Sequence, residues 1–267
     1  MRHVLTQCTI FEMEHFLGLD SYYSVAFVFA VALFAGLVKG VVGFAMPAIL
    51  ISGLTFVLAP EQALAALIVP TLVTNVWQAM RQGIGSAIKT VVQFRLFLAC
   101  GLVMLILSSQ LVRVLDARIL YGLIGGPVAL FAALQVVGWH PKLEQRSARI
   151  EAAVGCFAGF IGGMSGIWGP PTVGYLTAVD TPKKEQICAQ GVIYGLAAVA
   201  LAGSHIQTGV FRVDSLPLTF TILPFALGGV WLGFRVQDSI PQVAFRFVTL
   251  IVLLLTGLNL LRRALIG

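Results

Sequence analysis

Glycines and prolines interrupt an apolar stretch of bilayer length in the second half of the chain. The run Gly159–Pro171, GFIGGMSGIWGPP, lies inside apolar sequence that extends from about residue 152 to residue 178. Glycine weakens a helical backbone, and each proline removes an N–H donor. Within hydrocarbon, broken backbone is tolerated only where it is buried in protein or lines a wet cavity. The run therefore predicts either a seam of close helix packing or a binding site at membrane depth.

A similar run occurs earlier in the chain, at Gly36–Pro47, GLVKGVVGFAMP. Interrupted apolar segments at corresponding positions of two halves are the best sequence indication of a transporter's binding site. We therefore expect both runs to contribute to one site. The two runs align in pairs: Gly36 with Gly159, Gly40 with Gly163, Gly43 with Gly166, and Pro47 with Pro170.

The composition requires a membrane. Of the 267 residues, 58% are hydrophobic and only 10% are charged, and the mean hydropathy is +0.95. A soluble domain carries about 25% charged residues. The net charge of +6 does not indicate a nucleic-acid partner, because the basic residues lie mostly in short loops between apolar segments. The chain is thus predicted to be an all-α polytopic membrane protein in contact with the lipid bilayer.

The apolar segments divide the chain into two halves. We expect two tandem repeats of about four transmembrane helices, each opening with a Gly/Pro-broken segment. The predicted parts are an N-terminal interfacial lead at 1–21, a first repeat at 22–138, a cytoplasmic basic loop at 139–151 and a second repeat at 152–262.

Two orientations follow from counting lysine and arginine on each side of the membrane. If each half makes four crossings, ten lie on one side and five on the other, and both termini are cytoplasmic. If the two broken segments are hairpins, the split is nine to six and the termini lie outside. The first arrangement has the larger bias, so we expect a multi-pass protein of a bacterial-type inner membrane with cytoplasmic termini.

Soluble catalytic motifs are absent from the sequence. There is no P-loop, G-x-S-x-G, H-E-x-x-H or C-x-x-C. The four cysteines show no metal-ligand spacing, and the four histidines are not clustered. We therefore predict no enzymatic activity, no catalytic residues, no cofactor and no metal site.

Charged residues at membrane depth are cations rather than acids. All eleven carboxylates fall at segment boundaries or in loops, whereas Lys39 lies well inside the first segment and Arg246 within the last. A buried cation normally faces a cavity or the interior of the helix bundle. For Arg246, snorkelling to the interface is the simpler reading. Lys39 indicates an anionic ligand.

The predicted anion site lies where the two broken segments meet. Lys39 would supply the charge, and Ser165 and Trp168 would shape the pocket. A half-helix that begins near Pro170 would direct free N–H groups and a positive dipole end at the anion. The residues expected to bind substrate are Lys39, Gly40, Gly43, Gly163, Ser165, Gly166, Trp168 and Gly169.

The two Gly/Pro runs, the small size and the internal repeat together resemble the TauE/SafE sulfite-exporter family of membrane permeases, over about residues 24–262. The resemblance implies transport of sulfur-containing anions such as sulfite or organosulfonates. Because an inside-negative potential drives anions outward and no buried carboxylate is evident to bind a coupling cation, export is favoured over uptake. The alternative is a membrane scaffold or assembly factor whose glycines only pack helices. An oligomer is compatible with either reading.

Overall fold

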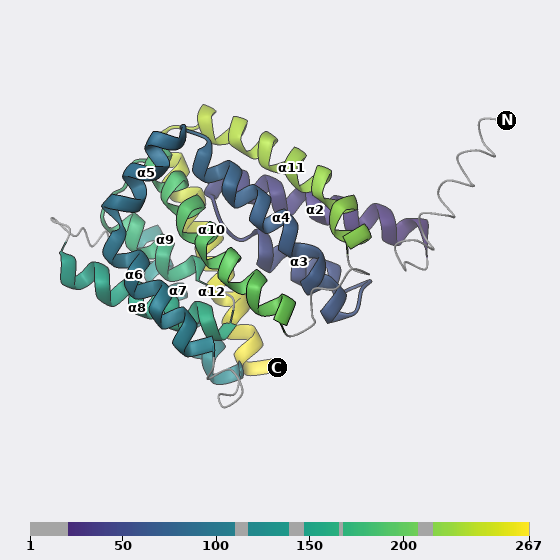
Figure 1. Ribbon diagram of the computed structural model, residues 1–267, viewed down its shortest axis with the longest axis horizontal. Helices are drawn as coiled ribbons and strands as arrows, with labels where there is room; N and C mark the ends of the chain where they lie inside the picture. The colour runs from purple at the N-terminus through teal and green to yellow at the C-terminus, as the bar shows by residue number, and fades with distance from the viewer. Residues whose placement is uncertain (1–20, 110–116, 139–146, 166–167, 208–215, 267) are drawn as a thin grey trace.

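The computed structural model describes residues 21–109, 117–138, 147–165, 168–207 and 216–266. Most of the predicted lead (1–21), most of the basic loop (139–151) and Gly166 lie outside these residues. All the regular secondary structure of the described residues is helical (Figure 1). The helices are α2 (Tyr22–Val42), α3 (Met46–Leu54), α4 (Pro60–Met80), α5 (Ile84–Gln93), α6 (Arg95–Ser109), α7 (Ala117–Val136), α8 (Ala148–Ser165), α9 (Gly169–Ala178), α10 (Lys183–Gln207), α11 (Leu216–Ser239) and α12 (Gln242–Ile266).

Several of these helices have the length and apolar composition of a membrane span. Four meet both criteria alone: Tyr22–Val42, Gln62–Met80, Leu216–Ser239 and Gln242–Ile266. A fifth candidate joins Ile84–Gln93 to Arg95–Ser108 across a bend of 75°. The all-helical membrane class predicted from composition is therefore confirmed.

The first broken segment turns back on itself. Helix α2 ends at Gly43, which adopts a left-handed conformation (φ 88°). The N–H of Gly43 donates to the carbonyl oxygen of Lys39 at 2.6 Å. Helix α3 begins three residues later with Pro47 in its first turn, where proline needs no N–H partner. It then runs antiparallel to α2, so that the ring of Phe56 lies 6.4 Å from that of Phe27 near the start of α2.

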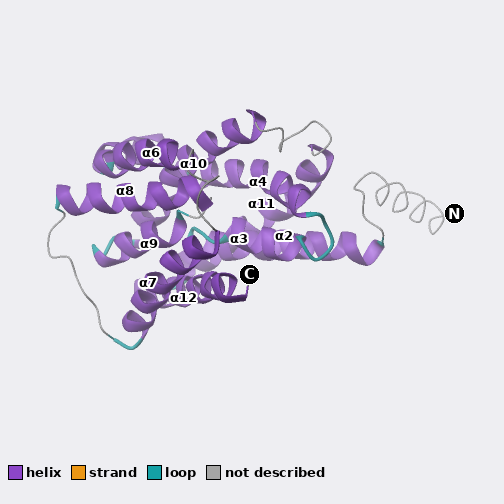
Figure 2. Cartoon of the chain, turned by 90° about the horizontal axis from the view of Figure 1, so that it is seen from below, coloured by secondary structure: helices purple, strands orange, loops and turns teal. Residues whose placement is uncertain are grey.

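The second broken segment has the same form. Trp168 follows α8 and lies beside Gly162, whereas Tyr175, seven residues later, stacks on Phe97 at 6.1 Å. Because Phe97 also contacts Gly155 in the first half of α8, α9 runs back along α8. Figure 2 shows α9 between α8 on one side and α7 with α12 on the other.

Helices in corresponding positions of the two halves pack in a reciprocal pattern. Helix α2 packs on α11 and α8 packs on α6, whereas α4 packs on α10 and α7 on α12 (Figure 1). Gly191 contacts Ala79 and Gly195 contacts Asn75, so α4 and α10 run in opposite directions. The contacts between the two halves are therefore reciprocal, and α4 and α10 are antiparallel where they meet.

The hairpin form of the broken segments bears on the charge count. Helices α2 and α4 run in the same direction, since Lys39 contacts Asn75 and Gly43 contacts Gln78. Helix α3 returns the chain between them. The expectation of cytoplasmic termini assumed a single crossing for each broken segment, whereas the nine-to-six alternative assumed hairpins. The orientation of the termini stays a prediction.

Candidate functional site

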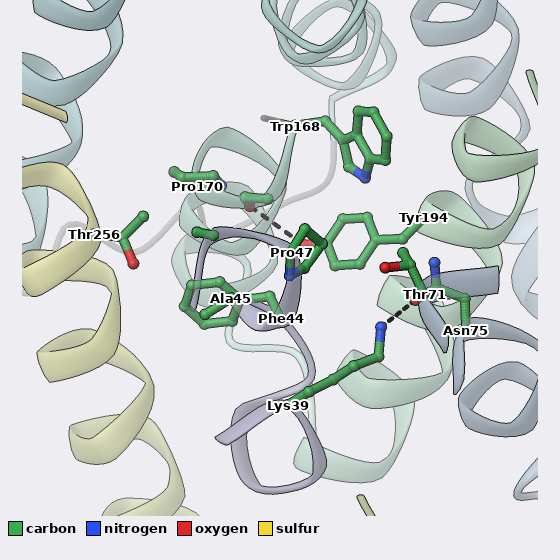
Figure 3. A pocket seen from close by; sticks show the side chains of 12 residues that line it. Lys39, Phe44, Ala45, Pro47, Thr71, Asn75, Trp168, Pro170, Tyr194 and Thr256 are labelled. Atoms are coloured by element: carbon green, nitrogen blue, oxygen red, sulfur yellow. Dashed lines mark hydrogen bonds between the residues drawn. The ribbon is translucent and has the colours of Figure 1, made fainter. Parts of the chain in front are cut away.

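A small pocket lies where the two broken segments approach each other. Its volume is about 60 Å³, enough for about four water molecules or one small polyatomic ion. Six helices, α2, α3, α4, α9, α10 and α12, and the residues beside the two breaks form its wall (Figure 3). The lining residues are Lys39, Phe44, Ala45, Pro47, Ala48, Thr71, Asn75, Trp168, Gly169, Pro170, Tyr194 and Thr256.

Polar hydrogen-bond donors gather at one side of this pocket. Lys39 is 2% exposed, and its ammonium donates to Oδ1 of Asn75. The amide nitrogen of Asn75 and the hydroxyl of Thr71 are buried and have no hydrogen-bond partner. Figure 3 shows the three side chains side by side, directed at one another across the gap between α2 and α4. An ammonium group has three donors, so Lys39 keeps two beyond the one that Asn75 accepts.

Aromatic groups form the opposite wall. The hydroxyl of Tyr194, on α10, donates to the carbonyl of Gly169 at 3.2 Å. The hydroxyl of Thr172 donates to the carbonyl of Trp168 at 2.9 Å, which fixes the start of α9. Proline at the beginning of α9 suits positions whose N–H groups lack a helical partner in any case. The pocket therefore combines a cationic donor cluster with an aromatic wall.

Gln78 ties the first break to the opposite half of the protein. Its amide nitrogen donates to the carbonyl of Gly43 at 3.1 Å and to that of Ile187, on α10, at 2.9 Å. Gly43 packs so closely on the side chain of Gln190 that a Cβ there would stand 1.6 Å from its Oε1. The backbone at the break is thus buried in protein and its carbonyl is satisfied, as hydrocarbon requires.

The structure places only part of the predicted set in the pocket. Lys39, Trp168 and Gly169 line it. Gly40 instead packs on α11, where a Cβ would stand 2.4 Å from the carbonyl oxygen of Val230. Gly163 packs on α6 in the same way, 2.3 Å from the carbonyl oxygen of Leu105.

The remaining predicted residues contribute differently. The N–H of Gly43 is bonded to Lys39 within α2. Ser165 is the last residue of α8, and Gly166 lies outside the described residues.

The pocket also contains side chains that the prediction did not assign to it, namely Asn75, Thr71 and Tyr194. Their signal in the sequence is spacing, because residues 71 and 75 are four apart and share one face of α4.

Two charged residues outside the pocket, Arg246 and Glu151, have structural partners. Arg246 pairs with Asp180 at 3.1 Å and donates to Gln135 at 3.0 Å, so it joins α12 to α7 and to the loop after α9. Among the side chains that the structure describes, Glu151 is the buried carboxylate, and it accepts from the backbone N–H of Phe97 at 3.3 Å. It lies in the first turn of α8, where the helix dipole favours a negative charge.

These features define a polytopic helical membrane protein with a pocket between two broken segments. The sequence profile of the family described as sulfite exporter TauE/SafE matches residues 28–260. The chain therefore belongs to the TauE/SafE sulfite exporter family, as its two Gly/Pro runs predicted. Members of this family are membrane transporters of sulfur-containing anions rather than enzymes. No curated protein matches the chain, and no solved structure does.

Proposed function

We propose that the protein is a permease for a small sulfur-containing oxyanion, sulfite or an organosulfonate, and that the pocket around Lys39 is its binding site. The observation that carries the proposal is the convergence of Lys39 Nζ, Asn75 Nδ2 and Thr71 Oγ1 on one small cavity. Two of these three atoms have no protein partner. An oxyanion accepts hydrogen bonds on several oxygens, so one ion can satisfy all three groups.

The energetics of burial support an anionic occupant. A lysine at the centre of a membrane helix costs about 2.5–3.5 kcal/mol on insertion scales. Leaving a buried polar group without a partner costs about 1–3 kcal/mol more. The oxygen of Asn75 offers the ammonium a dipole but no charge. A bound anion would supply the missing charge and would also satisfy the amide of Asn75 and the hydroxyl of Thr71.

The glycines of the two runs divide into two roles in this proposal. Gly40 and Gly163 allow α2 and α8 to approach α11 and α6 closely. Gly169 and Trp168 close the pocket from the second half. The substrate-binding set becomes Lys39, Thr71 and Asn75 as donors, with Trp168, Gly169 and Tyr194 as walls. The two tandem repeats, each opening with a broken hairpin, thereby contribute unequal halves of one site.

Export is the favoured direction. An inside-negative potential is worth about 2.3 kcal/mol per charge per 100 mV, and it drives an anion out of the cell without coupling. Uptake would need a co-transported cation. The buried carboxylate among the described side chains, Glu151, is not among the residues that line the pocket.

The proposed location is a bacterial-type inner membrane, in the hairpin topology. Helix α12 places Arg263 beside Ser52 of α3 at 3.0 Å, so the last helix ends on the same side as the start of α2. The nine-to-six charge split then assigns the termini to the extracytoplasmic face. This revises the orientation expected from four crossings per half.

A scaffold without transport is the second candidate, and the glycine packing favours it. At Gly36, Gly40, Gly159 and Gly163, a Cβ would stand 2.0–2.4 Å from a neighbouring backbone oxygen. Close packing alone, however, gives no role to a buried lysine beside unpaired donors. The two candidates differ in whether the purified protein binds an anion.

Flux in proteoliposomes tests the proposal. The purified protein is reconstituted, and efflux of sulfite, sulfate, methanesulfonate and chloride is measured with and without an imposed potential. We expect saturable sulfite or sulfonate flux that accelerates when the anion-containing side is negative. Sulfite binding and flux equal to those of empty liposomes would reject the permease and leave the scaffold.

A further inference from the structure

A second, larger cavity adjoins the Lys39 pocket. This groove has a volume of about 650 Å³ and lies between α2 and α3 on one side and α12 on the other. Its walls are almost entirely apolar and include Phe34, Ile49, Phe56, Val252 and Leu255. Phe34, Phe56 and Leu255 are more than half exposed, so the groove opens on the lipid-facing surface.

The groove and the pocket share one wall. Ala45, Ala48 and Thr256 line both cavities. Two of the three are alanines, whose small side chains keep the junction open. From this junction the groove extends along α2 from Val38 to Ala30, eight residues or about 12 Å.

The far end of the groove is polar. Ser52 and Asn259 line it there. Arg263 donates to the hydroxyl of Ser52 at 3.0 Å, and Arg262 donates to the amide oxygen of Asn259 at 3.1 Å. The apolar stretch thus runs between a buried cation at one end and surface cations at the other.

We propose that the anion handled by this protein carries an apolar tail, with the sulfonate or sulfite-like head at Lys39 and the tail in the groove. This inference rests on the proposed function and narrows its substrate to amphiphilic organic anions. A bare inorganic anion fits the 60 Å³ pocket but leaves the 650 Å³ groove unused. An apolar groove that begins at the anion pocket can hold the apolar tail of a molecule whose charged head lies in that pocket.

The experiment measures how alkanesulfonates of increasing length inhibit sulfite flux in proteoliposomes. Each methylene that enters the groove contributes about 0.8 kcal/mol, or about a fourfold fall in the inhibitory concentration. We expect this trend from methanesulfonate towards octanesulfonate in the wild-type protein. In Thr256→Phe, which fills the junction, the series should become flat. Because Thr256 also lines the pocket, the readout for this variant is the ratio of methanesulfonate to octanesulfonate inhibition and not the absolute inhibition. Leu258→Phe is the matched control, because Leu258 is on the same helix, is 49% exposed and lies outside the groove.

A second variant separates tail binding from damage to the pocket. Leu255→Trp narrows the groove without touching a residue of the pocket, so it should weaken octanesulfonate and leave sulfite flux unchanged. Partition of long sulfonates into the bilayer is equal for all variants and cancels in the comparison. The same length dependence in Thr256→Phe, Leu255→Trp and wild type would mean that the groove holds lipid, and would overturn the inference. A flat wild-type series would do the same, whereas absence of any sulfite binding or flux would reject the permease itself.

Discussion

The side chain of Trp168 packs against Gly162, where an added Cβ would stand 3.0 Å from the tryptophan Cβ and Cε3. In the alignment of the two Gly/Pro runs, Gly162 corresponds to Lys39. One half of the protein therefore places a cation at this position, and the other half leaves a gap that an indole fills. In the proposed site, a single anion bound between the halves would meet charge on one side and an aromatic wall on the other.

Substitutions at Gly162 test this arrangement. Gly162→Ala requires Trp168 to shift by a few tenths of an ångström, and we expect anion affinity to fall several-fold. Gly162→Leu should displace the indole towards the pocket and abolish binding. Titration of sulfite by calorimetry on purified protein measures both effects. Gly174→Ala is the control, since its Cβ would meet Phe131 at an ordinary 3.5 Å. Equal losses in Gly174→Ala and Gly162→Ala would contradict a specific role for Trp168.

Lys39 is expected to carry most of the anion affinity. Hydrogen bonds to charged groups contribute about 1.5–3 kcal/mol, which corresponds to about 10- to 100-fold in affinity. Lys39→Met should therefore keep the fold but lose most flux, and Lys39→Arg should retain part of it because charge persists while donor geometry changes. Flux in proteoliposomes at matched protein amounts gives the comparison. Wild-type flux in Lys39→Met would mean that the lysine serves only the packing of α2 and α4.

A second substitution at the same site distinguishes the loss of a free positive charge from a loss of folding. Asn75→Asp keeps the size of the side chain but places a carboxylate beside the ammonium of Lys39. The resulting ion pair would occupy the cation internally, so sulfite flux should fall as far as in Lys39→Met. The melting temperature in detergent should stay near that of the wild type. A variant that transports normally would show that the site does not depend on a free positive charge.

Much of this organisation could be predicted from the sequence, because it depends on the composition of individual segments. Charge-poor apolar segments determine the membrane class, and a lysine at depth stands out because burying it is costly. Asn75 and Thr71, by contrast, do not stand out in the sequence. Neither residue is unusual within a helix. Their role appears only when α4 places them beside Lys39, and the sequence contains no signal for that contact.

The glycines show the opposite limitation. Both runs predicted a break, and the breaks do lie beside the pocket, but Gly40 and Gly163 face neighbouring helices instead. Glycine has the same sequence signature whether it admits a ligand or another helix. The number of membrane crossings made by each broken segment could not be predicted either, because the length of an apolar segment does not distinguish a long span from a hairpin.

Gly163 should be intolerant of a side chain for reasons of stability. An added Cβ would stand 2.2 Å from Ser108 Oγ and 2.3 Å from the carbonyl oxygen of Leu105. Forcing α8 away from α6 in this way costs about 1–3 kcal/mol. Gly163→Ala should therefore lower the melting temperature in detergent. A Cβ added at Gly85, in α5, would meet no neighbouring atom within 4 Å. Gly85→Ala should therefore leave the melting temperature unchanged or raise it slightly. A Gly163→Ala protein as stable as Gly85→Ala would contradict the packing role.

The hairpin topology predicts where the ends of the chain lie. If each broken segment returns to the side from which it began, the side with more lysine and arginine holds the loops after α4, α7 and α9. Alkaline phosphatase fused after Gly267 should then be active, because that enzyme requires the periplasm, and green fluorescent protein at the same position should be dark. Fusions after Gly83, in the loop that follows α4, should give the reverse pattern. A fluorescent fusion at Gly267 would instead support four crossings per half. That result would require α3 and α9 to continue across the membrane, against their observed contacts with α2 and α8.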